Sequence, residues 1–129
     1  EFWLPHLRIE YSAGLEDYVD ITELCNILSD TLKETNLFPT AGIRVRAFST
    51  TKFSIADEDK ENMFCDMHLR IGQGRSKNDR IIVGEAMFKR AKQIFNDLLK
   101  REYFALSIEI VEIEKAFSWK SNSIHRRLV

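Results

Sequence analysis

The sequence has no apolar run near the ~20 residues that a membrane-spanning helix needs. It also shows no secretory signal peptide, because its opening EFWLPHL lacks a basic start and a long apolar stretch. Its 19 basic and 20 acidic residues leave a formal net charge of −1, which disfavours a wide phosphate-binding surface. We therefore expect neither a membrane nor a nucleic acid as a partner, although a local cluster of arginines is compatible with this balance.

Cysteine and histidine are scarce as well. The two cysteines, Cys25 and Cys65, fall on apolar positions of the patterns described below, which is typical of buried free thiols and of the reducing cytoplasm. The three histidines, His6, His68 and His125, lie far apart in the chain without the spacing of metal ligands. We predict no metal site and a cytoplasmic protein. No Ser-His-Asp or Cys-His arrangement for nucleophilic catalysis stands out either.

The sequence does contain a regular order of strands and helices within 129 residues, a length that suits one domain. Alternation of apolar and polar residues predicts four half-buried strands, at residues 5–12, 43–50, 62–71 and 104–114. Helical spacing of apolar residues predicts two amphipathic helices, at residues 21–36 and 77–101. A polar loop at 50–62 separates two halves that have the same order of elements.

Two local signals add detail to this outline. Asp20 is followed three residues later by Glu23, which resembles a capping box and predicts the start of the first helix. The alternation of the last strand changes phase at Ile110 and Val111. This change predicts a bulge, or a strand that changes partners.

Because the order strand-helix-strand occurs twice, we predict two β-α-β units, each with parallel strands joined by a right-handed crossover. The expected fold is a two-layer α/β (α+β) domain, a four-stranded sheet with both helices on one face. The uncovered face would carry charged side chains: His6, Arg8, Glu10, Arg44, Arg46, Asp66, His68, Arg70 and Glu109. Two interpretations stay open, a solvated face with cross-strand ion pairs or sheets of several subunits that face one another across a polar interior.

Two short segments could bind an anion. The segment IGQGRS places Arg75 between a strand and a helix, where free backbone N–H groups and the positive end of the helix favour a carboxylate. It is not a phosphate-binding GxxxxGK[ST] loop, and on this segment alone a simple tight turn is the favoured interpretation. The segment AGIRVR carries Arg44 and Arg46, and an arginine fork can grip a carboxylate at two points. Paired arginines on a strand are, however, more often surface residues.

Pro5 decides between these readings, because an amino-terminal proline is a secondary amine rather than an amide. A free α-amino group has a pKa of about 7.7–8.0. Burial or nearby arginines disfavour the ammonium form and lower this pKa. Such a proline is a neutral base at pH 7, on a rigid ring, that can carry a proton between carbons of an acidic enol. An internal Pro5 has none of this chemistry, because its nitrogen is acylated.

The segments PHLRIEYS, LFPTAGIRVRA, LRIGQGRS, ALSIEIVEI and SNSIH together resemble the 5-carboxymethyl-2-hydroxymuconate delta-isomerase family of the tautomerase superfamily. The resemblance runs from Pro5 to the C-terminus. It implies a tautomerase-like fold, a homotrimer of β-α-β repeats with the sheets facing inward, and no cofactor. It also implies a dicarboxylate or tricarboxylate substrate made by ring cleavage of homoprotocatechuate, in which an enol or a double bond is shifted.

The resemblance also implies roles for particular residues. Pro5 takes the place of the amino-terminal proline base, and Arg44 and Arg75 take the places of arginines that would hold substrate carboxylates. Both arginines need not come from the same subunit. For His6, beside the base, and Trp119, near the tail, we expect packing roles.

The sequence departs from the family pattern in the residues EFWL that precede Pro5. We expect residues 1–4 to be a non-native extension from cloning and residues 5–129 to form a single tautomerase-like domain. The printed chain should then be nearly inactive until these four residues are removed. Two alternatives stay open: another tautomerase-superfamily activity on a small unsaturated acid, and a non-enzymatic trimeric module that binds small acids, in which Pro5 only starts a strand.

Overall fold

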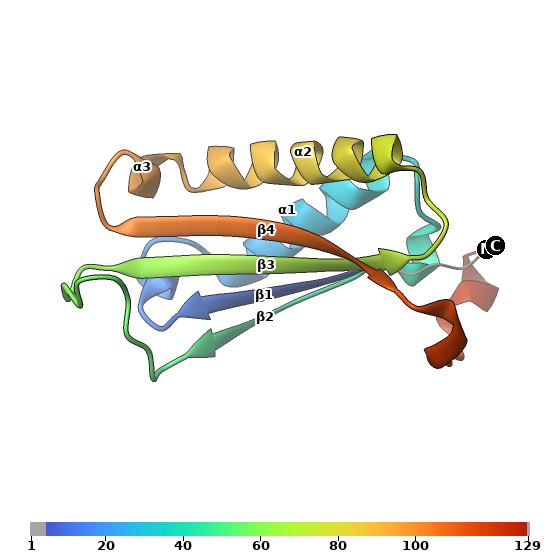
Figure 1. Cartoon of the computed structure of the whole chain (residues 1–129), viewed down its shortest axis with the longest axis horizontal. Coiled ribbons are helices and arrows are strands. Elements are labelled where there is room, and N and C mark those ends of the chain that lie inside the picture. Colours follow the sequence, from blue (N-terminus) through green and yellow to red (C-terminus); the bar gives the residue numbers. More distant parts are fainter. Residues whose placement is uncertain (1–4, 129) are drawn as a thin grey trace.

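The computed structural model describes residues 5–128 and has two layers, a four-stranded sheet and a layer of helices on one of its faces (Figure 1). The strands are β1 (His6–Ser12), β2 (Arg44–Thr50), β3 (Met63–Gly72) and β4 (Phe104–Ile113). The helices are α1 (Ile21–Glu34), α2 (Lys77–Ile94) and the short α3 (Asn96–Leu99). The described residues also form four 3-10 turns: η1 (Leu15–Asp17), η2 (Thr40–Gly42), η3 (Lys115–Phe117) and η4 (Ile124–Arg127). The predicted fold class is confirmed.

The sheet joins the two β-α-β units through their first strands. Its strand order is β2-β1-β3-β4. β1 and β2 are parallel, β3 and β4 are parallel, and β1 and β3 pair in antiparallel fashion. Consequently the first residues of β1 and β2 lie at the same end of the sheet as the last residues of β3 and β4. We call this end the Pro5 end of the sheet.

The core lies between the sheet and the helices. The odd-numbered residues of β1 and β3 point to this layer, and Leu7, Ile9, Met67, Leu69 and Ile71 have no exposed surface. They pack against buried residues that recur at helical spacing, namely Leu24, Leu28 and Leu32 of α1 and Val83, Met87 and Ala91 of α2. Because burying one such large apolar side chain stabilises a fold by about 1.5–3 kcal/mol, this layer determines which face the helices cover.

The helix starts follow the cap signals. The carboxylate of Asp20 accepts a hydrogen bond of 3.1 Å from the backbone N–H of Glu23, as predicted for the start of α1. Ser76 Oγ caps α2 in the same way, by accepting a 3.0 Å hydrogen bond from the N–H of Asp79. At its C-terminus α1 ends at Glu34 rather than at 36, where Asn36 takes a left-handed conformation with φ 58°.

The second helix is shorter than predicted. Instead of continuing to residue 101, α2 ends at Ile94, and Phe95 leaves the helical conformation with φ −95° and ψ 17° before α3 begins. The break allows Phe95 to be buried with its ring centroid 4.9 Å from that of Phe104 on β4. Leu98 of α3 is buried as well. Burial of these apolar side chains against β4 explains why a straight helix is not formed here.

The bulge predicted in the last strand is wrong. β4 pairs with β3 without interruption, from Phe104 opposite Met63 to Ile113 opposite Gly72. Ile110 packs against the core, whereas Val111 is 41% exposed on the open face of this edge strand. The change of phase in the sequence therefore reflects an apolar residue on the open face and not a change in backbone pairing.

Candidate active site

The three predicted site residues all lie at the Pro5 end of the sheet. Pro5 is buried and directly precedes β1, and Arg44 is the first residue of β2. Arg75 follows the end of β3 after Gly74, whose φ of 98° turns the chain toward α2. The carbonyl oxygen of Pro5 accepts a 3.1 Å hydrogen bond from the backbone N–H of Arg44. Strand pairing therefore brings together segments that are about 30 to 70 positions apart in the sequence.

Arg44 points to the open face of the sheet. It is exposed and stands opposite His6 in the parallel pair of β1 and β2, while Val45 and Leu7, one position further on, face the core. The period of two along a strand places the guanidinium on the face away from the helices. A two-point contact with a carboxylate is thus sterically possible from this face.

Arg75 is held by an aromatic ring. Its guanidinium carbon lies 4.7 Å from the centroid of Phe38, a buried residue that comes shortly before η2. The Nε atom of Arg75 is buried and has no hydrogen-bond partner within residues 5–128. A buried donor without a partner costs stability, and an anionic ligand would satisfy it. The ring and the unpaired donor together present a cation that is positioned in advance.

The pKa of His6 reflects burial and the positive charge of this region. The pKa of His6 is lowered from 6.5 to about 4, mainly by partial burial and in addition by the positive charges of Arg44, Arg70, Arg46 and Lys120. His6 is therefore neutral at pH 7, and it is surrounded by cations. Arg70 belongs to this surrounding set, although the sequence had placed it only on the uncovered face. The missing signal was strand pairing, since Arg70 stands opposite His6 in the antiparallel pair of β1 and β3.

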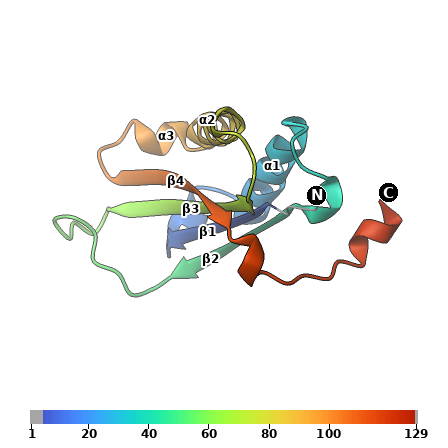
Figure 2. The same ribbon diagram turned by 45° about the vertical axis from the view of Figure 1, so that its right-hand side comes forward.

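The C-terminal segment packs back on the same end of the sheet (Figure 2). The side-chain amide of Asn122 donates a 2.9 Å hydrogen bond to the carbonyl of Ala41 in η2. The backbone N–H of Lys115 donates a 2.7 Å hydrogen bond to the side-chain oxygen of Gln73. Between these anchors Trp119 is 84% exposed, so the packing role expected for Trp119 is wrong within this chain.

The open face of the sheet is polar, as predicted, but it is not laced with cross-strand ion pairs. Within the described part of the chain its one ion pair joins His68 and Asp66 of the same strand, with Nε2 and Oδ2 3.0 Å apart. Asp66 also accepts a 2.7 Å hydrogen bond from Ser107. Arg8 lies 5.3 Å from the ring centroid of Phe48. Arg8, Arg44, Arg46 and Arg70 of this face therefore have no carboxylate partner among the described residues.

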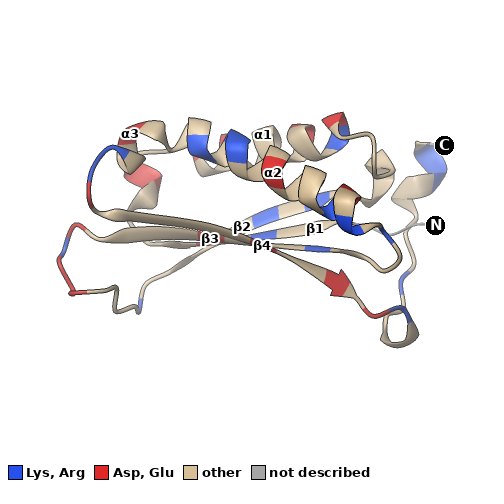
Figure 3. Cartoon of the chain, turned by 45° about the horizontal axis from the view of Figure 1, so that its top comes forward, with Lys and Arg blue, Asp and Glu red and all other residues tan. Residues whose placement is uncertain are grey.

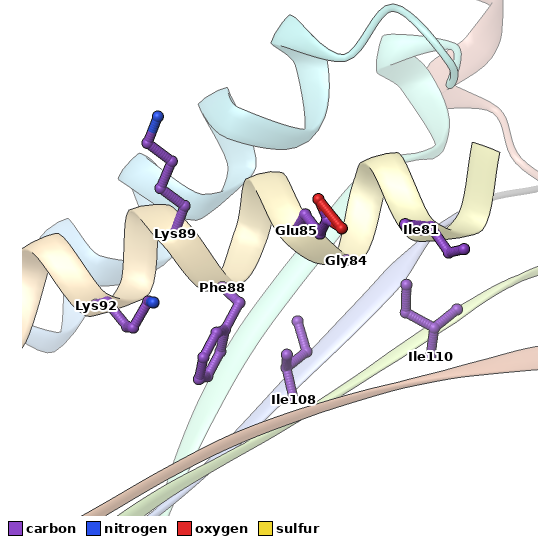
Figure 4. Close-up of a pocket in the computed structure, with 8 residues that line it drawn as sticks. All are labelled: Ile81, Gly84, Glu85, Phe88, Lys89, Lys92, Ile108 and Ile110. Atoms are coloured by element: carbon purple, nitrogen blue, oxygen red, sulfur yellow. The ribbon is translucent and has the colours of Figure 1, made fainter. Parts of the chain in front are cut away.

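A groove lies on the helix side of the sheet. It has a volume of about 620 Å³ between α2 and β4 (Figure 4). Its lining is mostly apolar and consists of Ile81, Gly84, Glu85, Phe88, Lys89, Lys92, Ile108 and Ile110. A Cβ atom at Gly84 would lie 3.1 Å from the Cδ1 atom of Ile110, so α2 approaches β4 closely at this point. The groove contains none of the predicted site residues, and its apolar wall does not suit a carboxylate-rich molecule.

Within residues 5–128 no three His, Cys, Asp or Glu side chains are grouped so that they could hold a metal ion. Neither α2 nor any other helix of this range combines the length and the apolarity of a membrane span. Cys65 is buried, as predicted, whereas Cys25 is only partly buried, and both are free thiols.

The two β-α-β units, joined in one four-stranded sheet, define the class of this protein as a tautomerase-like fold. A fused 4-OT protein described as a wild-type symmetric trimer has the same fold, with a TM-score of 0.58, 14% identity and coverage of 83% of this chain and 85% of that one. More particularly, the chain belongs to the 5-carboxymethyl-2-hydroxymuconate isomerase family, whose model matches residues 5–128. It is therefore an isomerase.

Two relatives carry the same family name. The 5-carboxymethyl-2-hydroxymuconate Delta-isomerase of Escherichia coli is 34% identical over 122 residues, which cover 95% of this chain and 97% of that protein. The crystal structure of a 5-carboxymethyl-2-hydroxymuconate isomerase from Deinococcus radiodurans R1 is also 34% identical and has a TM-score of 0.91. That comparison covers 98% of this chain and 95% of the other.

Proposed function

We propose that this protein isomerises 5-carboxymethyl-2-hydroxymuconate in the breakdown of homoprotocatechuate, with Pro5 as its amino-terminal base and without a cofactor. The names of the two relatives support the substrate. The observation that carries the proposal is the placement of Pro5, Arg44 and Arg75 at one end of the sheet. A base at the same end of the sheet as two cations that can bind carboxylates suits a proton shift in a polycarboxylate.

Pro5 suits the role of base only when its nitrogen is free. The match to the family begins at Pro5, which supports an active chain that starts there. The same burial and the same arginine charges that lower the pKa of His6 would disfavour a charged ammonium on the neighbouring residue. The amine of Pro5 would then be neutral at pH 7 and able to accept a proton.

The reaction moves one proton and changes no oxidation state. Pro5 takes the proton from the 2-hydroxy group or from an adjacent carbon, which leaves a dienolate. The protonated Pro5 then returns the proton to a distal carbon of the conjugated chain, and the enol becomes a ketone. Arg44 and Arg75 hold the carboxylates and stabilise the negative charge of the dienolate, a contribution that is largest where water is excluded.

We further propose a homotrimer in which the open faces of the sheets turn inward. The open face is polar, and its arginines form no ion pair with a carboxylate of residues 5–128, which supports an arrangement in which this face borders a wet interior. Light scattering on the purified chain measures the molar mass directly. A mass near three times 15.1 kDa is expected, and a monomer would contradict the proposal.

The test of the function compares two chains. One is the printed sequence, in which the nitrogen of Pro5 is acylated, and the other begins at Pro5. Ketonisation of 5-carboxymethyl-2-hydroxymuconate is followed by its ultraviolet absorbance, and mass spectrometry verifies each first residue. We expect turnover from the chain that begins at Pro5 and a loss of about 10²–10⁴-fold in the printed chain. Equal turnover by both chains would refute Pro5 as the base.

A further inference from the structure

A row of three basic side chains crosses the Pro5 end of the open face. His6 on β1 stands opposite Arg44 on β2 and opposite Arg70 on β3. Neighbouring strands lie about 4.8 Å apart, so the two arginines flank His6 on one face. The fourth position of the row is Val111 on β4, which stands opposite Arg70 and carries no charge.

The row has no acidic member, unlike the rows beyond it. The next row along the face, which contains Arg8, ends in Glu109, and the row after that contains Glu10 and Asp66. The open face thus changes from positive at the Pro5 end to mixed in charge farther along the strands, and Figure 3 shows the blue bands on β1 and β2. Within residues 5–128 Arg70 forms no ion pair.

Because His6 is neutral at pH 7, the positive charges of the row are those of Arg44 and Arg70, which repel each other across β1. The side chain of Arg70 is half-buried and therefore does not extend freely into solvent. Lys120, from the segment that folds back over this end, adds a further positive charge to the surroundings of His6. Sheet stability does not explain this accumulation of cations, whereas a bound anion would.

We propose that Arg70 and His6, beside Arg44, form a third carboxylate subsite that holds the carboxymethyl group of the substrate. This inference rests on the proposed function, because it assumes a substrate with three carboxylates. Arg44 and Arg75 would bind the two carboxylates of the conjugated chain. That chain is the part of the substrate that gains negative charge in the dienolate. The branch takes no part in the proton shift, and Arg70 provides a cation for it on the open face. Arg70 is thus a specificity-determining residue.

The first experiment uses the chain that begins at Pro5 and two substrates, 5-carboxymethyl-2-hydroxymuconate and 2-hydroxymuconate, which lacks the branch. In Arg70→Gln we expect kcat/KM to fall about 10–100-fold for the tricarboxylate and less than about threefold for the dicarboxylate, as for loss of one charged hydrogen bond. Arg70→Lys should recover part of the loss. Arg8→Gln, a matched change one row away, should affect the two substrates equally. Equal losses for both substrates in Arg70→Gln would overturn the subsite.

A second measurement separates failure of the subsite from failure of the proposed function. Calorimetry gives the affinity of each variant for two unreactive probes, tricarballylate with three carboxylates and glutarate with two. The subsite predicts a preference for tricarballylate that Arg70→Gln abolishes, even if no substrate is turned over and the proposed function falls. No preference in the parent chain, or one that survives in a folded Arg70→Gln variant, overturns the subsite. Circular dichroism and thermal unfolding establish that each variant is folded.

Discussion

The backbone N–H of Arg44 donates a 3.1 Å hydrogen bond to the carbonyl oxygen of Pro5. This bond is the first contact between β1 and β2, and it holds the chain immediately after the Pro5 ring. The same strand pairing then puts the side chain of Arg44 opposite that of His6 on the open face. The backbone thus couples the position of the proposed base, Pro5, to that of Arg44, which is proposed to bind a substrate carboxylate.

Replacing Pro5 by alanine in the chain that begins at this residue should lower kcat at least about 100-fold. Alanine keeps a free amine, but it is a primary amine on a chain that lacks the rigid ring. The thermal unfolding curve should change little, because the hydrogen bond to Arg44 uses the carbonyl of residue 5. Steady-state kinetics with the enol substrate measure the loss, and a variant with full kcat would show that the ring amine is not the base.

Phe38 should act as a positioning residue for Arg75. In Phe38→Leu the apolar contact remains but the ring face under the guanidinium is lost, and cation–π contacts are worth about 0.5–2 kcal/mol. We expect KM to rise about 3–10-fold with little change in kcat, because substrate binding is weakened and the base is untouched. The matched control is Phe88→Leu, which removes a ring beside Lys92 on the groove between α2 and β4. Equal kinetic effects of the two changes would contradict the role of Phe38.

Stability should depend on pH through His6. Its pKa is about 4 in the folded protein against 6.5 unfolded, so between these values the unfolded chain binds a proton that the folded chain does not. The free energy of unfolding should therefore fall as the pH falls from about 6.5 toward 4. Below pH 4 the contribution of His6 should no longer change with pH. His6→Gln should remove this part of the slope. Urea unfolding from pH 4 to 8 tests it, and identical slopes for parent and variant would count against the prediction.

The two thiols should differ in reactivity. Burial is the main cause that raises the pKa of Cys65 to about 12, and the nearby charge of Asp66 acts in the same direction. Burial also raises the pKa of the partly buried Cys25. In Cys25→Ser the remaining thiol should not react with Ellman's reagent at pH 8 until urea is added, whereas Cys65→Ser should react slowly in the folded state. Rapid labelling of native Cys25→Ser would contradict the burial of Cys65.

The sequence by itself determined the layers of this protein. Periods of two and of 3.6 residues place each side chain on a face, so the strands, the helices and the charged open face follow from local patterns. The starts of the helices follow as well, because a cap such as Asp20 acts within one turn. Pro5, Arg44 and Arg75 were predicted as site residues from the resemblance of short segments to a known family, which needs no knowledge of the residues they meet in the fold.

Only the tertiary structure decided which faces and edges meet. Antiparallel pairing of β1 and β3 places Arg70 beside His6, and no local pattern encodes a contact between residues 64 positions apart. The break at Phe95 and the uninterrupted β4 were missed for the same reason, since burial against another element outweighs the local preference of the chain. Periodicity records which side of a strand is apolar, whereas the choice of partner and register is made by packing of the whole core.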